Sequence, residues 1–518
     1  MGYYNPFYHL RCWCQKVLPT VYDDSLSYYE FLGKICKKVN DLGDIVNNII
    51  NTGSWNAIVA YTRPEFFGAV GDGVADDDKA VQDAIDDANK NHKIVLLSGR
   101  YLIGKTLNVP NGVVIIGQYG GELISKQMQE NGFVPTTILS VGSENAFINV
   151  VFNGNAPAGN SQAIGDRENN NPLVSCIGVS RVLFYGCSFK NYDSNYSDQI
   201  PSYNYACLSC RESDNLTIEK CEFNRDKREC TVFYNCHDVV IDSCIFNNGN
   251  EVGGNYSDIG MLNGYNFQVL NTHIYHGDNL TTSPINAMAD NIVIDNCWIY
   301  AKNSNYGIDY GSEIENNGFD ELTISNCFIQ TSIAASGNAS NIKHNHIRIY
   351  NNVIDGNDVT TASGQVMLYA FNGERIKVVN NEFRGGNGNN YAIRTEYTDG
   401  DIEIVNNIFD GNGIRTGSNT VGLVVNNNVF NGFGFFIGEA PDAIVDFPIL
   451  NCRFNDDIGK CANAVTYYNI IFIGCYLANT NLYWAVSTVP TPLFTHYDAS
   501  LSYVAEVGKG TVLPNDDT

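Results

Sequence analysis

The chain has 518 residues, of which 44% are hydrophobic, enough for one long core or several domains. The formal net charge of −25 argues against nucleic acid or an anionic membrane as ligand, because binding phosphate groups needs patches of Lys and Arg. No segment approaches the length of a membrane span, and the first residues lack the basic start and apolar run of a secretory signal.

The N-terminal part of the chain predicts a helix. Ser27-Tyr28-Tyr29-Glu30 has the form of a capping box. Apolar residues then recur at alternating steps of four and three, as in a heptad seam: Tyr28, Leu32, Ile35, Val39, Leu42, Val46 and Ile49. A short coiled coil is favoured over one amphipathic helix packed on its own chain, because no second helix of similar length is nearby. Residues 51–62 are expected to form a linker.

A glycine-rich and aspartate-rich motif follows in residues 63–117. Gly68-Ala69-Val70-Gly71-Asp72-Gly73 leads into Asp76-Asp77-Asp78 and then a segment with one apolar face, formed by Val81, Ala84, Ile85 and Ala88. Gly71 and Gly73 suit a tight turn with positive φ. We expect Asp78 to cap a helix and that helix to close the end of a repeat array. A structural role is favoured over a metal site at Asp72, Asp76 or Asp77. A metal site at His9, Cys12 and Cys14 is disfavoured as well, because that spacing fits no zinc pattern well.

This motif resembles the opening segment of the right-handed β-helix of the pectate lyase superfamily, which occurs in phage tailspikes and appendage proteins. The superfamily pattern has Thr or Ser where this chain has Asp78. The motif covers about 55 residues of this chain. The resemblance implies a long parallel β-helix, a carbohydrate ligand along one face of the rod, and in most members cleavage of that glycan.

From residue 182 a short strand-like pattern recurs twelve times, at intervals typical of a repeat architecture. Its form is apolar-x-apolar-x-[Asn/Gly]-[Cys/Asn]-x-[Phe/Ile], first in Val182–Phe189 and last in Ile470–Leu477. The pattern predicts an all-β solenoid, a single-stranded parallel β-helix. We expect the Cys/Asn position to point inward in every coil. Cys187, Cys221, Cys244, Cys297 and Cys327 should then be stacked, buried and reduced.

A second strand precedes each copy of the pattern, and its alternation indicates which acids face outward. If Ile308 and Tyr310 point inward, Asp309 points outward. Glu313 follows in the enlarged turn of the same coil, and Asp258 begins a strand two coils earlier. Asp309 with Glu313 or Asp258 is our candidate pair for general acid and base, with Tyr306 and Tyr310 as stacking platforms. Arg394 and Glu396, also expected to point outward, are alternates.

Other residues compete for a catalytic or binding role. Asp193 and Asp198 lie in an insertion that could form a lip or a Ca²⁺ loop, although a surface loop is the simpler interpretation. His237 with Asp238, and also His273 and His276, could act as general bases, although histidines on solenoid turns are more often plain surface residues. No cofactor is predicted, and the sequence gives Ca²⁺ no specific support.

These observations predict four segments: an N-terminal helical module (1–62), an opening and capping segment (63–117), a β-helix (118–480) and a C-terminal tail or cap (481–518). The resemblance implies a homotrimeric virion appendage, assembled in the host cytoplasm and attached to other tail or neck proteins through residues 1–62. Its expected role is to recognise and degrade a bacterial surface polysaccharide or teichoic acid. The alternative is a non-enzymatic receptor-binding or structural fibre.

The predicted coiled coil can be tested directly. Replacing Ile35 and Leu42 by Asp places charges in the seam, and unpaired buried charges are costly. A fragment ending near residue 60 should therefore lose its oligomeric mass in light scattering when it carries both substitutions. An unchanged mass would reject the coiled coil.

Overall fold

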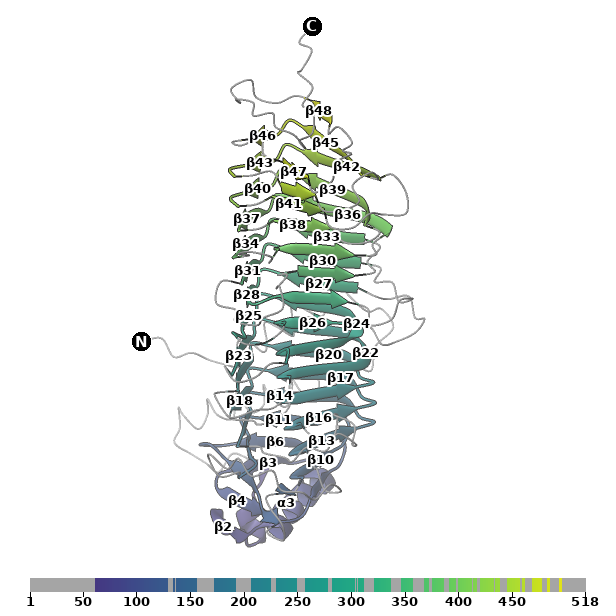
Figure 1. Ribbon diagram of the computed structural model, residues 1–518. Coiled ribbons are helices and arrows are strands. Elements are labelled where there is room, and N and C mark those ends of the chain that lie inside the picture. Colours follow the sequence, from purple (N-terminus) through teal and green to yellow (C-terminus); the bar gives the residue numbers. More distant parts are fainter. Residues whose placement is uncertain are drawn as a thin grey trace, which may run out of the picture.

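The computed structural model describes the chain between residues 61 and 495, apart from internal gaps, of which 156–171 and 192–205 are the longest. The predicted N-terminal helical module (1–62) therefore lies outside the described residues, except for Tyr61 and Thr62, which form a strand rather than part of a linker. The described part is an elongated stack of coils (Figure 1). Each full coil contributes three short strands, and neighbouring coils pair in parallel, as predicted for a parallel β-helix.

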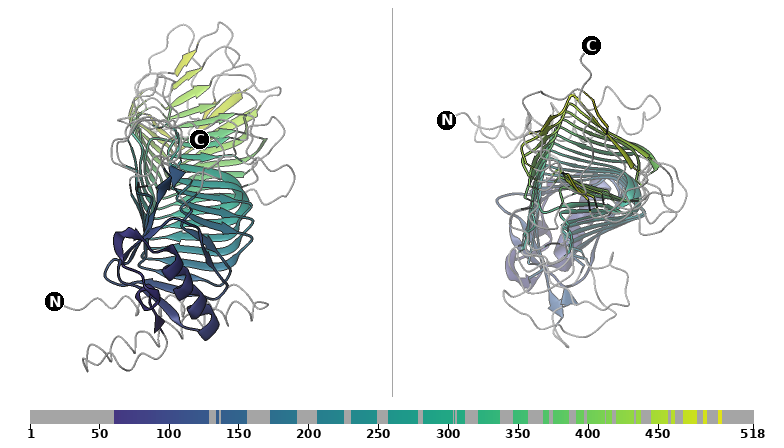
Figure 2. Two further views of the ribbon diagram at one scale, coloured as in Figure 1. Left: turned by 90° about the horizontal axis from the view of Figure 1, so that it is seen from below. Right: turned by 45° about the horizontal axis from the view of Figure 1, so that its top comes forward.

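The three strands of a coil form three walls around a common interior (Figure 2). The strands of the first wall are β5 (Leu107–Val109), β10 (Leu139–Val141), β13 (Val174–Ile177), β16 (Leu208–Arg211), β19 (Thr231–Tyr234), β26 (Ile308–Tyr310), β29 (Ile333–Ser336), β32 (Leu368–Phe371), β35 (Ile393–Glu396), β38 (Ile414–Thr416), β41 (Phe435–Ile437), β44 (Gly459–Cys461) and β47 (Leu482–Trp484). Two longer strands, β22 (Ile259–Leu270) and β24 (Ile285–Asp295), run through the first and second walls and join them into one sheet.

The second wall continues the same sheet, and the third wall is a separate one. The second wall contains β1 (Tyr61–Thr62), β3 (Ile94–Leu97), β6 (Val114–Gly117), β11 (Ala146–Ile148), β14 (Ser180–Tyr185), β17 (Asp214–Glu219), β20 (His237–Asp242), β27 (Glu321–Ser325), β30 (His346–Tyr350), β33 (Arg375–Val379), β36 (Asp399–Val405), β39 (Val421–Asn426), β42 (Val445–Leu450), β45 (Tyr468–Ile473) and β48 (Leu493–Thr495). The third wall contains β2 (Asp72–Asp76), β4 (Arg100–Ile103), β7 (Glu122–Ser125), β12 (Val151–Asn153), β15 (Ser188–Lys190), β18 (Glu222–Asn224), β21 (Ile245–Asn248), β23 (His273–His276), β25 (Trp298–Tyr300), β28 (Phe328–Gln330), β31 (Val353–Asp355), β34 (Glu382–Arg384), β37 (Ile408–Asp410), β40 (Val429–Phe430), β43 (Arg453–Phe454) and β46 (Tyr476–Leu477). A small antiparallel pair, β8 (Gln127–Met128) and β9 (Val134–Pro135), stands apart from both sheets.

Each copy of the repeated pattern turns a corner, so the interpretation of a copy as one straight strand was wrong. In the first copy, Val182–Tyr185 lies in the second wall and Ser188–Lys190 in the third. Gly186 between them has a φ of 62°, and Asn326, Asn351 and Asn406 occupy the same corner with φ values of 55°, 56° and 58°. Asn and Gly tolerate this left-handed conformation better than other residues, which explains the Asn/Gly position of the pattern.

The residue after each corner points inward, as predicted, and links neighbouring coils. The Asn381 side-chain amide donates hydrogen bonds to the Ile349 carbonyl (2.9 Å) and to Oδ1 of Asn407 (3.0 Å). The thiol of Cys221 approaches the Phe184 carbonyl at 3.5 Å in the corresponding place. The five predicted thiols, Cys187, Cys221, Cys244, Cys297 and Cys327, are buried and free of disulfides. Burial raises the pKa of Cys221, which keeps it a thiol.

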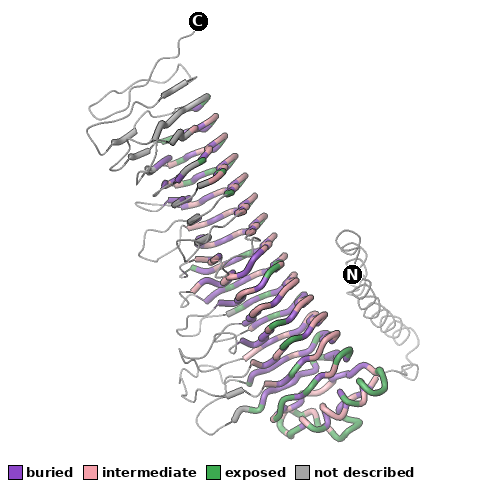
Figure 3. Tube along the Cα trace, turned by 90° about the vertical axis from the view of Figure 1, so that its right-hand side faces the viewer, coloured by how far each residue is buried: buried purple, intermediate pink, exposed green. Residues whose placement is uncertain are grey.

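A helix lies at the N-terminal end of the stack (Figure 1), where the chain surface is more exposed than along the walls (Figure 3). It is α3 (Asp78–Asn91), preceded by the 3₁₀ helix η2 (Pro64–Phe67), and it buries the predicted face of Val81, Ala84, Ile85 and Ala88. Asp78 is its first residue rather than its cap. Asp77 takes the capping position, but its carboxylate accepts hydrogen bonds from the backbone amides of Val70 (2.8 Å) and Gly71 (3.0 Å), so it holds the glycine-rich turn instead.

Adjacent asparagines at one corner should respond differently to substitution. Asn407→Ala removes a buried amide that joins coils, and leaves backbone groups unsatisfied, so it should cost about 1–3 kcal/mol of unfolding free energy. Asn406→Gly keeps the positive φ and loses only an exposed contact, so it should be nearly neutral. Denaturant unfolding of both variants measures the difference. Equal losses of unfolding free energy would contradict this role of the inward-pointing residues.

Candidate acid site on the first wall

Asp309 lies on the outer face of the first wall. In β26 the flanking Ile308 and Tyr310 are fully buried in the core, while Asp309 points away from it, as the alternation predicted. Its register partners are Asn286 on the preceding coil and Ala334 on the following one. Arg394 lies further along the same outward column, beyond Tyr369.

The carboxyl of Asp309 is half-buried, and none of the residues that the structure describes compensates for this burial. Burial raises its pKa, because the charged form loses hydration. Within the described part of the chain, no hydrogen bond or ion pair holds this carboxyl, so nothing offsets that loss. A raised pKa favours the protonated form of the carboxyl, which is the form that a general acid needs.

Two polar groups near Asp309 complete the site. The Oδ1 atom of Asn286 is buried and has no hydrogen-bond partner among the described residues. Burial and the Asp309 charge raise the pKa of the Tyr306 phenol, and the Arg394 charge lowers it, so Tyr306 senses both side chains. Buried polar groups without partners are rare in folded proteins. Asp309 and Asn286 side by side therefore offer a donor and an acceptor for a bound molecule.

Two of the predicted site residues are not on the surface. Asp258 is fully buried, and its Oδ2 lies 2.7 Å from Nδ1 of His276, which is buried as well. The expected pair of Asp309 with Asp258 was therefore wrong, since Asp258 faces a buried partner and not the outer face. Tyr310 was wrongly expected to stack on a ligand, because its ring is fully buried in the core.

The remaining candidates divide between placed and unplaced residues. His237 stacks on Tyr265 with ring centroids 4.0 Å apart, and Asp238 accepts a hydrogen bond from Asn266 at 2.9 Å, so both have structural contacts. Asp193, Asp198, Glu313 and the Glu396 side chain lie outside the described residues. Among the residues that the structure describes, no cluster of His, Cys, Asp or Glu side chains could hold a metal ion, and no helix is long and apolar enough to cross a bilayer.

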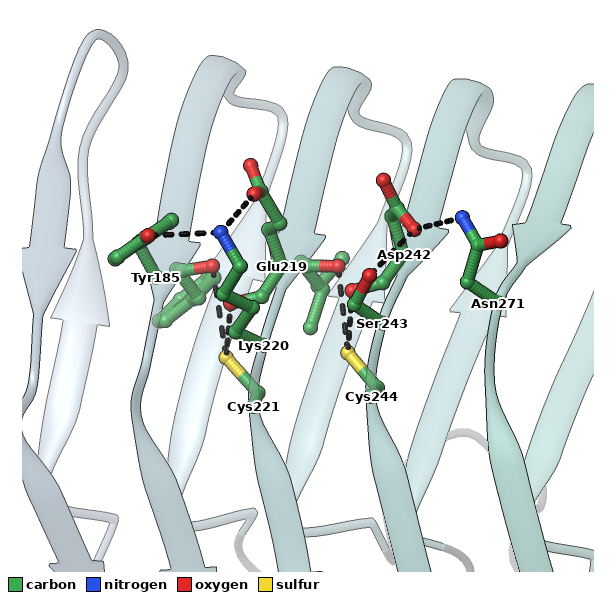
Figure 4. Close-up of polar contacts among 10 residues, drawn as sticks. Tyr185, Glu219, Lys220, Cys221, Asp242, Ser243, Cys244 and Asn271 are labelled. Atoms are coloured by element: carbon green, nitrogen blue, oxygen red, sulfur yellow. Dashed lines mark hydrogen bonds and ion pairs between the residues drawn. The ribbon is translucent and has the colours of Figure 1, made fainter. Parts of the chain in front are cut away.

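A second pair of acids on the second wall escaped the sequence analysis (Figure 4). Glu219 and Asp242 are register partners on β17 and β20. Glu219 binds Lys220 (2.9 Å), and Asp242 accepts hydrogen bonds from Ser243 (2.9 Å) and Asn271 (2.8 Å). Burial raises the pKa of Glu219 despite Lys220. Burial opposes the charge of Lys220, but hydrogen bonds to Tyr185 and Glu219 raise its pKa overall. Because both acids have partners, this network stabilises a corner and makes a weaker candidate for catalysis than Asp309.

Comparison with known proteins agrees with this architecture. Residues 65–170 match the family described as rhamnogalacturonase A/epimerase, pectate lyase-like. The described fold is a parallel β-helix, and the family match lies in its N-terminal coils.

The sequence is also distantly similar to phage proteins. The preneck appendage protein of Bacillus phage PZA is 23% identical over 257 residues, which cover 40% of this chain and 30% of that protein. A capsule K30/K69-specific depolymerase of Klebsiella phage K64-1 is 26% identical over 150 residues, covering 26% of this chain and 19% of the depolymerase. This chain thus spans less than a third of either relative. Tailspike protein 3 of bacteriophage CBA120 is similar in structure over 90% of this chain and 70% of its own, with 13% identity and a TM-score of 0.40.

The raised pKa of Asp309 predicts a pH-dependent effect on stability. Because the pKa is higher in the folded than in the unfolded chain, the carboxyl's stabilising contribution is complete below the unfolded pKa and is lost as pH rises through the folded pKa. Asp309→Asn should therefore melt at a higher temperature than the wild type at neutral pH, with a smaller difference in acid. The exposed Asp401→Asn serves as control. A lower melting temperature for Asp309→Asn at neutral pH would show that the ionised carboxylate supports the fold.

Proposed function

We propose that this chain belongs to a virion appendage that binds a bacterial surface glycan and cleaves it, with Asp309 as the general acid. The observation that supports this most is the half-buried carboxyl of Asp309 on the outer face of the first wall, which has no partner among the described residues. The similarity to a preneck appendage protein and to a capsule depolymerase supports the location and the class of ligand.

The proposed chemistry begins with proton transfer. The protonated Asp309 carboxyl donates its proton to the glycosidic oxygen as the bond to the anomeric carbon breaks, so that the leaving sugar departs as a neutral alcohol. Hydrolysis also needs an ionised carboxylate near the anomeric carbon. This group either takes a proton from the water that bonds to that carbon, or bonds to the carbon itself until water displaces it. Glu313 and Glu396 remain the candidates from the sequence. The distance between the two carboxyls would decide whether configuration is retained or inverted.

Arg394 and Tyr306 belong to the same proposal. The charges of Arg394 and Asp309 both act on the pKa of Tyr306, so the three side chains lie near one another. The two side chains would orient a sugar against the acid. If the enzyme were a lyase instead, a basic group would remove a proton beside a uronate carboxyl, and its products would carry unsaturated sugar ends that hydrolysis does not produce.

We also propose a homotrimer that docks on tail or neck proteins through residues 1–62. The heptad seam and the similarity to appendage proteins support this assembly. Light scattering of the full chain would give three times the monomer mass if the proposal is right.

The catalytic proposal predicts a large loss of rate without loss of fold. Asp309→Asn cannot donate a proton, so depolymerisation of a host surface glycan should slow by about 10²–10⁴-fold. Glu313→Gln should also abolish the reaction if Glu313 is the second carboxylate. Release of reducing ends measures the rate, and Asp401→Asn, an exposed acid on the second wall, should retain full activity.

Two outcomes would change this conclusion. Full activity in both Asp309→Asn and Glu313→Gln would place the catalytic site elsewhere, with Arg394 and Glu396 next to be substituted. A wild-type protein that binds host cells but releases no reducing or unsaturated ends from any surface preparation would favour the non-enzymatic receptor-binding fibre.

A further inference from the structure

A group of aromatic side chains lies on the outer face of the third wall. It comprises His273, Tyr275, Trp298, Tyr300 and Phe328, from the three neighbouring strands β23, β25 and β28, and is called the aromatic strip below. Tyr275 and Tyr300 stack with centroids 5.2 Å apart, as His273 and Trp298 do at 6.0 Å. Tyr275 and Trp298 are each 44% exposed.

The fold does not require aromatic residues at these positions. The inward residues of the same strands, Ile274, Ile299 and Ile329, are fully buried and fill the core. In other coils the outward column of Trp298 holds charged residues, such as Glu222 and Glu382. Exposed large aromatic rings gathered on three successive strands therefore point to a binding surface.

The size of the aromatic strip favours a narrow ligand. Three strands at about 4.8 Å spacing and two outward columns about 7 Å apart give a footprint far smaller than the roughly 800 Å² that each partner contributes to a stable protein interface. A second protein chain would bury much more than the strip provides. A single extended polymer chain along the stack matches its width.

The chemistry of the surroundings separates two kinds of polymer. Trp298 is tilted by 43° to Tyr300 and by 32° to Phe328, so the two stacked pairs do not continue as one regular stack through the strip. Pyranose rings present C–H faces that pack on aromatic rings, whereas polyol phosphate chains have no such rings. A polyanion would also be repelled by this protein chain, whose net charge is −25.

Polar side chains continue the strip along the rod. The outward column of Tyr275 and Tyr300 runs on into Gln330, Asp355 and Arg384. The Arg384 guanidinium is held by Glu382 at 2.7 Å. Aromatic platforms beside a few oriented hydrogen-bonding groups are typical of sites for polar ligands that carry apolar faces.

We propose that the aromatic strip binds a neutral, pyranose-containing polysaccharide and that this is the substrate class of the protein, in preference to a polyol-phosphate teichoic acid. This inference rests on the proposed function and names its ligand. The strip and the acid site lie at the same height, because the end of β25 at Tyr300 is joined to β26 and Asp309 by the short connection 301–307. A chain bound on the third wall thus passes the corner that leads to Asp309.

The test uses the full chain carrying Asp309→Asn, so that no probe is consumed. The migration of the protein is measured in native gels that contain a glucan, a mannan, a galactan or a rhamnan. It is compared with its migration in gels that contain poly(glycerol phosphate). At least one neutral polysaccharide should retard the protein, and adding Trp298→Ala or Tyr300→Ala should weaken its binding about tenfold. Trp298→Phe should keep most of the binding. Tyr476→Ala, an exposed aromatic on the same wall but on distant β46, should change nothing.

Several results would overturn the inference. They are retention by poly(glycerol phosphate) alone, no retention by any of the neutral polysaccharides, and unchanged binding in the Trp298→Ala and Tyr300→Ala variants. A change in solution mass in either variant would instead identify the strip as a contact between copies. Failure of the proposed catalytic function is recognised separately, as full cleavage activity in Asp309→Asn with an intact Trp298.

Discussion

The inward-pointing residue after each corner, called the inward slot below, forms hydrogen bonds that hold neighbouring coils in one register. Asn407 donates to the Val378 carbonyl of the preceding coil at 2.8 Å and accepts from the backbone amide of Asn381 at 2.8 Å. Where the slot holds cysteine, the thiol approaches the equivalent carbonyl, as Cys297 does toward Val269 at 3.4 Å. Because side chains alternate with a period of two, a slip of one residue would turn every outward residue into the core. The slot therefore determines which side chains can meet a ligand.

A fixed register turns each wall into columns of aligned outward positions, and the unusual residues within those columns mark the candidate sites. Several carboxylates on the walls have a partner, as Glu122 does with Arg100 (2.7 Å) and Lys190 (2.8 Å). Asp309 and Asn286 break that pattern. The Asn286 Oδ1 atom is buried, the Asp309 carboxyl is half-buried, and neither has a partner in the described chain. Local departures of this kind are expected where function opposes stability.

The repeat pattern and strand alternation were sufficient to predict the parallel β-helix, the buried thiols and the outward direction of Asp309. They could not show that each copy turns a corner, because the positive φ at Gly186 or Asn326 is a backbone property that the apolar spacing does not encode. They also missed the burial of Asp258, whose partner His276 arrives from another wall. The aromatic strip needs the alignment of Tyr275 with Tyr300 across coils, and that alignment depends on the corners.

The connections between strands vary in length, whereas the inward slots of neighbouring coils stay aligned. Successive slot residues are 21 positions apart between Asn407 and Asn428 and 30 apart between Cys297 and Cys327, yet both pairs are aligned. Insertions and deletions outside the strands therefore leave the neighbouring coils in place. Recombination can therefore exchange loops, or even whole coils, in such a scaffold without changing its fold. Its ligand preference can consequently diverge faster than its architecture, which accords with the low sequence identity between this chain and the relatives it matches.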